Sequence, residues 1–97
     1  MIQTREEARE KCSEYGIPEH MWEAVERWVI DHQACGSFFT LLVSNDLFGA
    51  FMTADDFNLF VMQAWVKLMY NEFPSEAWGS PEKVQAWINA GEVQADG

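Results

Sequence analysis

The chain has 97 residues, 48% of them hydrophobic, which suits a single domain with one core. Its 16 acidic and 6 basic side chains give a formal net charge of -10, so no basic stripe is available to neutralise nucleic-acid phosphates or anionic lipid headgroups. We therefore expect no direct binding to nucleic acid or to a membrane, and we expect a protein partner with a basic surface. Acidity that serves only solubility is the alternative.

Two further features of composition bear on where the protein works. The sequence has no apolar run of about 18 residues, and residues 1–15 are too charged for the apolar core of a signal peptide. Cys12 and Cys35 are a single pair, so reduced thiols are expected rather than the dense disulfides of a secreted scaffold. These observations predict a cytoplasmic protein.

The first predicted helix is a charged one over residues 4–15. Thr4 and Glu7 have the spacing of a capping box, and Gly16 offers a left-handed end. Its thin apolar face consists of Ala8, Cys12 and Tyr15. We expect this helix to be peripheral and to dock only lightly.

A second helix is predicted from Pro18 to about Gln33. Pro18 fits the first position, and apolar residues at steps of 3 and 4 form its core stripe: Trp22, Val25 and Val29, continued by His32. The acids of the first two helices are expected on outer faces, where they would form a partner-binding surface: Glu6, Glu10, Glu14, Glu23 and Glu26.

Two short helices are predicted in the middle of the chain, one capped by Ser37 and one starting at Asn45 or Asp46. Four phenylalanines crowd this region: Phe38, Phe39, Phe48 and Phe51. They cannot all face the same neighbouring helix, so one or two should be exposed or in an interface. Phe38 is our candidate aromatic anchor.

The central element is predicted to be one buried helix over residues 55–73. Asp55 or Asp56 can cap its start, and Pro74 stops it. Apolar residues occupy most of its circumference and leave a narrow polar stripe of Gln63, Lys67 and Asn71, which is typical of a helix covered on most sides. Trp65 and Leu68 should be among the most buried residues.

The last helix has Ser80 as its cap, Pro81 at its first position and Gly91 as its stop. Its apolar face is Val84, Trp87 and Ile88, and residues 92–97 are expected to form a flexible tail. Trp78 lies in the preceding turn, where it is either a lid on the core, the favoured interpretation, or a binding anchor. Together these elements predict an all-α fold: one domain over residues 1–97, a compact irregular bundle of about five to six helices around the central buried helix.

Catalytic and metal-binding patterns are weak. Cys35 and His32 are the only local pairing for nucleophilic chemistry, and Cys12 and His20 lack the tight spacing of zinc ligands. The adjacent carboxylates Asp55 and Asp56 are explained by a helix start rather than by acid–base chemistry. We expect no enzyme activity, cofactor or metal.

Four sequence blocks follow one another along the chain: GSFFTLLVSNDLFGAF, TADDFN, MYNEFP and WGSPEKVQAW. As a set they resemble a family of small uncharacterised phage- and prophage-encoded proteins, over a span from about Pro18 to Trp87. The resemblance implies a phage protein in the cytoplasm of a bacterial host, but no catalytic or binding residue can be transferred from the family. Small acidic phage proteins of this kind are frequently inhibitors of host proteins, including nucleic-acid-handling defence machinery.

Two hypotheses follow. In the first, the chain is a non-enzymatic interaction protein that binds and inhibits or redirects a basic host protein, as an anti-CRISPR-like protein or nucleic-acid mimic would. Its contacts would be the acids of the first two helices, or an alternative face with Asp46, Asp55, Asp56, Glu72 and Glu76, beside an aromatic anchor at Phe38 or Trp78. In the second, the chain is a self-associating, homodimeric structural or regulatory module.

Overall fold

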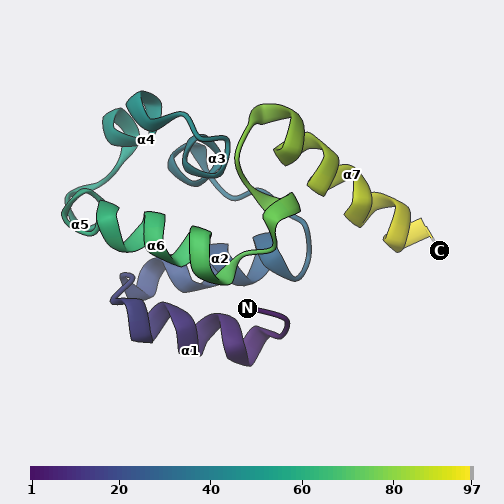
Figure 1. Ribbon diagram of the computed structural model, residues 1–97, viewed down its shortest axis with the longest axis horizontal. Helices are drawn as coiled ribbons and strands as arrows, with labels where there is room; N and C mark the ends of the chain where they lie inside the picture. Colours follow the sequence, from purple (N-terminus) through teal and green to yellow (C-terminus); the bar gives the residue numbers. More distant parts are fainter. Residues whose placement is uncertain (97) are drawn as a thin grey trace.

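Seven α-helices and two short 3-10 turns make up the computed structural model, which describes the backbone of residues 1–96 and the side chains of residues 1–92 (Figure 1). In chain order they are α1 (Arg5–Tyr15), η1 (Glu19–Met21), α2 (Trp22–Val29), α3 (Ser37–Val43), α4 (Leu47–Thr53), α5 (Asp56–Phe60), α6 (Met62–Glu72), η2 (Ser75–Ala77) and α7 (Pro81–Asp96). The predicted all-α fold is confirmed, with more helices than expected. No helix in this described part of the chain is both long and apolar enough to cross a membrane.

Side-chain caps start four of the helices where the sequence predicts them. Thr4, Asp46, Asp55 and Ser80 each accept a hydrogen bond of 2.7 to 3.1 Å from the backbone N–H three residues later. Such a cap satisfies one of the N–H groups that a helix start leaves unpaired. Ser37 is an exception, because α3 already includes it and the cap position belongs to Gly36.

The predicted central helix over residues 55–73 is not continuous. Val61 has non-helical backbone angles, φ -111° and ψ 26°, and separates α5 from α6. The side-chain oxygen of buried Asn58 accepts a 3.0 Å hydrogen bond from the indole N–H of Trp65 across this break. In a straight helix the two residues would lie about 10 Å apart along the axis. The bend therefore gives a buried amide its partner.

The core lies where α6 passes between α1 and α3 (Figure 1). Trp65 and Leu68 are fully buried, as predicted. Ala8 and Cys12 of α1 are also fully buried, and the backbone N–H of Ile2 donates to the carbonyl of Glu72 at 2.8 Å. Helix α1 is thus docked more deeply than the lightly attached peripheral helix we expected.

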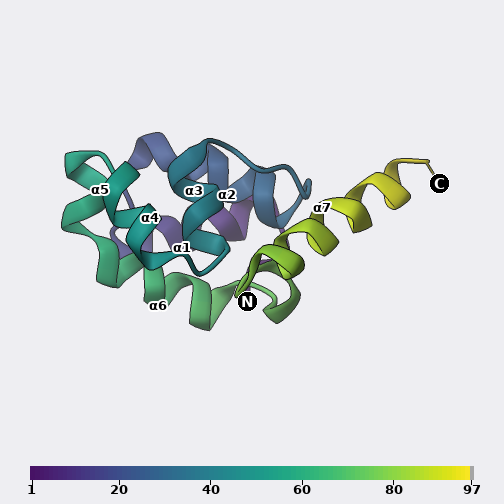
Figure 2. The ribbon, with the colours of Figure 1, turned by 90° about the horizontal axis from the view of Figure 1, so that it is seen from above.

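Helix α7 extends from the body as an arm (Figure 2). It continues through Gly91 to Asp96, so the predicted helix stop at Gly91 is wrong. The flexibility of residues 92–97 stays a prediction, and Gly97 lies outside the described residues. A Cβ atom at Gly91 would lie 2.5 Å from the Cβ of His32. Glycine at this position therefore allows α7 to approach the segment after α2, and it does not end the helix.

Candidate protein-binding surface

Nine large apolar side chains are exposed on α4, α5 and α6. This set, which we call the apolar surface, comprises Leu47, Phe48, Phe51, Met52, Phe57, Leu59, Phe60, Val66 and Tyr70. Phe60 is 91% exposed and Phe48 is 79% exposed, so these rings project into solvent. Apart from Met1, every large apolar side chain that is exposed within residues 1–92 belongs to this one region. Such concentration is unusual, because single exposed apolar residues are normally scattered.

The composition of α4 explains its contribution. Within this helix only Ala50 is buried, and the helix packs on α3. Phe48, Phe51 and Met52 follow at steps of 3 and 1 and therefore share a different face. A small residue faces the core while three large apolar residues face water.

Helices α5 and α6 likewise leave one side uncovered. Asn58 is the single buried residue of α5, and Trp65 and Leu68 are on the covered side of α6. Val66 and Tyr70, four residues apart, lie on the solvent side. The prediction that the helix over residues 55–73 is covered on most sides is therefore wrong, because only its inner face meets other helices.

A groove between α4 and α6 crosses the apolar surface. Its volume is about 430 Å³, and it is lined by Leu47, Phe51, Met62, Gln63 and Val66. Gln63 is the only polar residue among them. The groove shows that residues of α4 and α6, distant in sequence, form one continuous surface.

Exposed carboxylates border this surface. Asp46 precedes α4, and Asp55 and Asp56 begin α5. The hydrogen bond from the backbone N–H of Asn58 lowers the pKa of Asp55, and His20, whose Nε2 lies 2.9 Å from Asp55 Oδ2, lowers this pKa further. Within residues 44–70 the only basic side chain is Lys67, so the border is acidic.

The acids predicted on α1 form a separate group. Glu6, Glu10 and Glu14 line a shallow groove on the outside of the molecule, together with Arg9, Ser13 and Trp22. Helices α1 and α4 lie on opposite sides of the body, with α6 between them (Figure 1). The structure therefore brings these three glutamates together, but it does not place them beside the apolar surface.

Two of the predicted acidic contact residues are buried instead. Glu26 is only 7% exposed, and its Oε1 accepts a 2.6 Å hydrogen bond from Arg9 Nε, because α1 packs across this face of α2. Glu72 is also buried, and its Oε2 accepts a 2.8 Å hydrogen bond from the hydroxyl of Tyr15. Glu23 does face solvent, as predicted, and pairs there with Arg27.

The two predicted aromatic anchors pack against the protein itself. Phe38 is buried, with its ring edge-to-face on Trp65 at 5.9 Å, so its assignment as an exposed anchor is wrong; α3 lies directly on α6 at this point. Trp78 is partly buried against the core and lies beside Tyr70, in agreement with the lid interpretation. Of the four phenylalanines in the middle helices, Phe48 and Phe51 are exposed, and the prediction that one or two would be is confirmed.

The exposed residues of α5 and α6 were missed by the sequence reasoning. Phe57, Phe60 and Tyr70 were treated as part of a buried helix, although its apolar residues extend almost all the way round. A helix of that composition needs neighbours on several sides. The neighbouring predicted helices were too short to bury the apolar residues on all of its sides. This mismatch was the available signal for an exposed surface.

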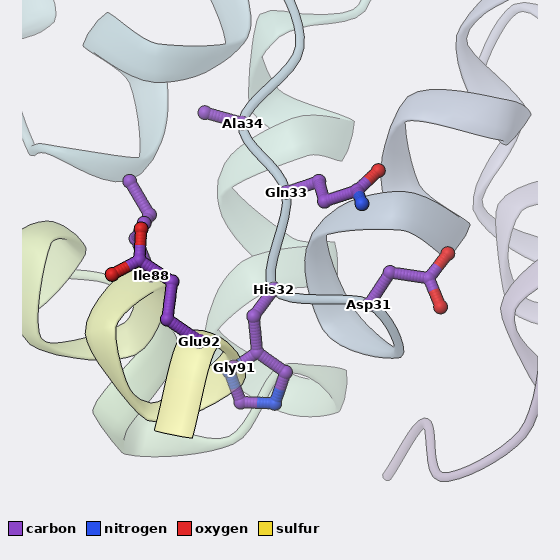
Figure 3. A pocket seen from close by; sticks show the side chains of 7 residues that line it. All are labelled: Asp31, His32, Gln33, Ala34, Ile88, Gly91 and Glu92. Atoms are coloured by element: carbon purple, nitrogen blue, oxygen red, sulfur yellow. The ribbon is translucent and has the colours of Figure 1, made fainter. Parts of the chain in front are cut away.

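A second pocket, of about 480 Å³, lies between α7 and the segment after α2 (Figure 3). Its polar groups do not converge: His32 points toward α7 beside Gly91, whereas Asp31 and Gln33 point away from Glu92 (Figure 3). The His32 ring stacks on Trp87 at 3.9 Å, and its Nδ1 donates to the carbonyl of Trp87 at 2.7 Å. The ring is thereby occupied in holding α7.

In the described part of the chain, Cys35 and His32 each contact other groups. The Cys35 thiol lies 3.7 Å from the carbonyl oxygen of Gln33, and the His32 ring is directed to Trp87. Burial raises the pKa of Cys12 to about 12, so its thiol stays protonated at neutral pH. Within residues 1–92, no three His, Cys, Asp or Glu side chains lie where they could hold a metal ion.

Comparison with known proteins adds no relative: no family model matches the chain, and no curated protein or solved structure matches it.

Proposed function

We propose that the protein is a non-enzymatic interaction protein that binds a host protein through the apolar surface of α4, α5 and α6 and inhibits or redirects it. The observation that carries the proposal is the gathering of nine large apolar side chains on one exposed region. Contiguous apolar patches on soluble monomers are usually small, and larger ones are typical of interaction sites. Aromatic residues are also enriched among the residues that dominate binding energies.

Folding alone does not account for these side chains. Phe48 and Phe60 are mostly in water, so replacing them with polar residues would remove little packing. Leaving them apolar carries a risk of aggregation. A partner that covers them explains why they are apolar.

The overall charge supports a basic partner. With a net charge of -10, the protein would be drawn toward a positively charged surface, and this attraction would weaken as salt is added. The resemblance to phage-encoded proteins supports a bacterial host protein, of which a nucleic-acid-binding channel is one basic example. Binding of a second copy is the competing function, because the same apolar surface could be covered in a homodimer.

Site-specific photocrosslinking in bacterial cells tests this proposal. A photoreactive phenylalanine analogue at position 60 would sit in the apolar surface, and the same analogue at position 10 would sit on α1, on the opposite side. We expect position 60, but not position 10, to capture a host protein, and Phe51→Ser to reduce the yield. Equal capture from both positions, or none from either, would refute the proposal. Capture of another copy alone would favour the homodimer.

A further inference from the structure

The helices that form the apolar surface restrict the backbone conformation of a segment that binds to it. The apolar surface is built from helices, and residues 1–96 contain no strand whose edge an extended segment could join. An extended segment on this surface would cover its own N–H and C=O groups without offering them partners, which is costly. A helix pairs these groups internally and can present a row of apolar side chains to a groove.

The groove between α4 and α6 provides a place for such side chains. It is open to solvent beside Phe51 and Val66, and Gln63 is its only polar lining residue. Phe48 of α4 and Phe60 of α5 add further exposed apolar area on the helices next to it. An amphipathic helix fits this arrangement, since its apolar side chains recur every three or four residues on one face.

The charges at the border indicate what surrounds that apolar row. Asp46, Asp55 and Asp56 are exposed there, and Lys67 is the only lysine or arginine within residues 44–70, although His20 contacts Asp55. A second copy of the chain would bring the same three carboxylates and a further charge of -10. Like charges oppose such an approach, whereas lysine or arginine side chains would favour it.

Resting on the proposed function, we propose that the groove between α4 and α6 binds a basic amphipathic helix of the partner protein, which inserts apolar side chains between Phe51 and Val66. The flanking lysine or arginine side chains of that helix face Asp46 and Asp56.

Fluorescence anisotropy with designed peptides tests this inference. The probe is a labelled peptide of about 14 residues, some four helical turns, with leucine at every third or fourth position and lysine elsewhere. One control peptide has the same number of leucines and lysines but places the leucines at alternate positions of one segment, so that they do not share a helical face. A second control peptide has glutamate in place of lysine. We expect the first peptide to bind at least about tenfold more tightly than either control, a difference of about 1.4 kcal/mol.

Variants of the protein test whether the peptide binds in the groove between α4 and α6. Phe51→Ser should weaken binding of the first peptide about tenfold or more, in keeping with loss of a central anchor. Asp56→Asn should weaken it more than Glu10→Gln, which removes one carboxylate from the opposite side of the body. Circular dichroism of each variant confirms that it is folded. Equal binding of the alternating or the acidic peptide would overturn the inference, as would an unchanged affinity in Phe51→Ser.

Two further results separate this inference from the proposed function. If position 60 captures a host protein in cells but the basic amphipathic peptide does not bind, the inference is overturned and the proposed function stands. If sedimentation shows a dimer that Phe51→Ser converts to a monomer, the occupant is a second copy and the inference is overturned.

Discussion

Two regions of this small protein differ in which side chains they bury and which they expose. Where α1 meets α2 and α6, carboxylates are buried and each has a partner: Glu26 is bonded to Arg9 and Glu72 to Tyr15. Across α4 and α5, by contrast, the phenylalanines are in water. Burying a paired charge and exposing an aromatic ring both oppose the usual distribution of residues. The buried carboxylates are compensated by partners within the molecule, whereas the exposed aromatic rings are not.

Helix length differs in the same direction. Helices α1 and α6 each have 11 residues, whereas α4 has 7 and α5 has 5. Short helices are marginal by themselves, so α4 and α5 depend on their caps, Asp46 and Asp55, and on packing of one buried residue each. We infer that α1 and α6 stabilise the fold and that α4 and α5 mainly present a surface. Four predictions would break or sharpen this contrast.

The largest expected effect is at Leu68 on the buried face of α6. Leu68→Ala should lower the free energy of unfolding by about 2 to 5 kcal/mol, because it opens a cavity in the core. Val66→Ala, two residues away on the solvent face, is the matched control and should cost about 0.5 kcal/mol or less. Urea denaturation measures both. A loss below about 1 kcal/mol for Leu68→Ala would contradict the central role of α6.

A smaller loss is expected at Gly91, where α7 meets the body. Gly91→Ala would place a Cβ 2.5 Å from the Cβ of His32, and relieving this clash should cost about 1 to 3 kcal/mol. His32 has φ 58°, which glycine tolerates well, so His32→Gly removes the opposing Cβ without new backbone strain. In that background Gly91→Ala should cost much less. Equal costs in the two backgrounds would show that the contact does not limit α7.

The third expected effect is a loss of stability that appears only at acidic pH and depends on Glu72. Burial by itself raises the pKa of Glu72, but the hydrogen bond from Tyr15, the N-terminal ammonium group and Lys11 outweigh it, so the pKa is lower in the folded protein than in the unfolded chain. The resulting stability is fully present above the ordinary glutamate pKa of about 4.3 and is lost as pH falls through the lowered value.

Thermal melts between pH 7 and pH 2 measure this dependence. Glu72→Gln should flatten the acid limb of the curve, whereas Glu10→Gln, on the exposed face of α1, should not. An unchanged acid limb in Glu72→Gln would show that other carboxylates govern acid unfolding.

The smallest expected effect is at Phe60. Because the ring is 91% exposed, Phe60→Ser should change the free energy of unfolding by no more than about 0.5 kcal/mol. Light scattering should show no increase in association, because an exposed apolar group has been removed. A large loss of stability would mean that α5 contributes to the core and would remove the contrast between the two sides.

Local signals in the sequence were sufficient for several helix starts and for the centre of the core. The helix predicted from Pro18 to about Gln33 was too long, because α2 spans only Trp22–Val29. Thr4 and Ser80 were correctly assigned as helix starts, and the structure selects Asp46 over Asn45 and Asp55 over Asp56, since each cap is an interaction across three residues. The burial of Trp65 and Leu68 followed from helical periodicity. These features depend on near neighbours in the chain.

Features set by distant neighbours could not be predicted. The sequence pattern cannot distinguish an apolar residue that faces the core from one that awaits a partner, and Phe57 and Phe60 were therefore assigned to the interior. Glu26 looked exposed because its burial depends on Arg9 from another helix. Gly91 looked like a helix end because the approach of His32, 59 positions earlier, leaves no trace in the local sequence.

The bend between α5 and α6 gives the molecule a built-in spectroscopic reporter. The indole proton of Trp65 is held by Asn58 across the bend, whereas that of Trp28, also buried, is held by the carbonyl of Ala77 on the far side of the core. Solvent exchange of the Trp65 proton requires the bend to open, and the Trp28 proton provides the reference for the rest of the fold. Nuclear magnetic resonance of these two protons would report whether the bend becomes more or less protected when the phenylalanines of α5 are covered.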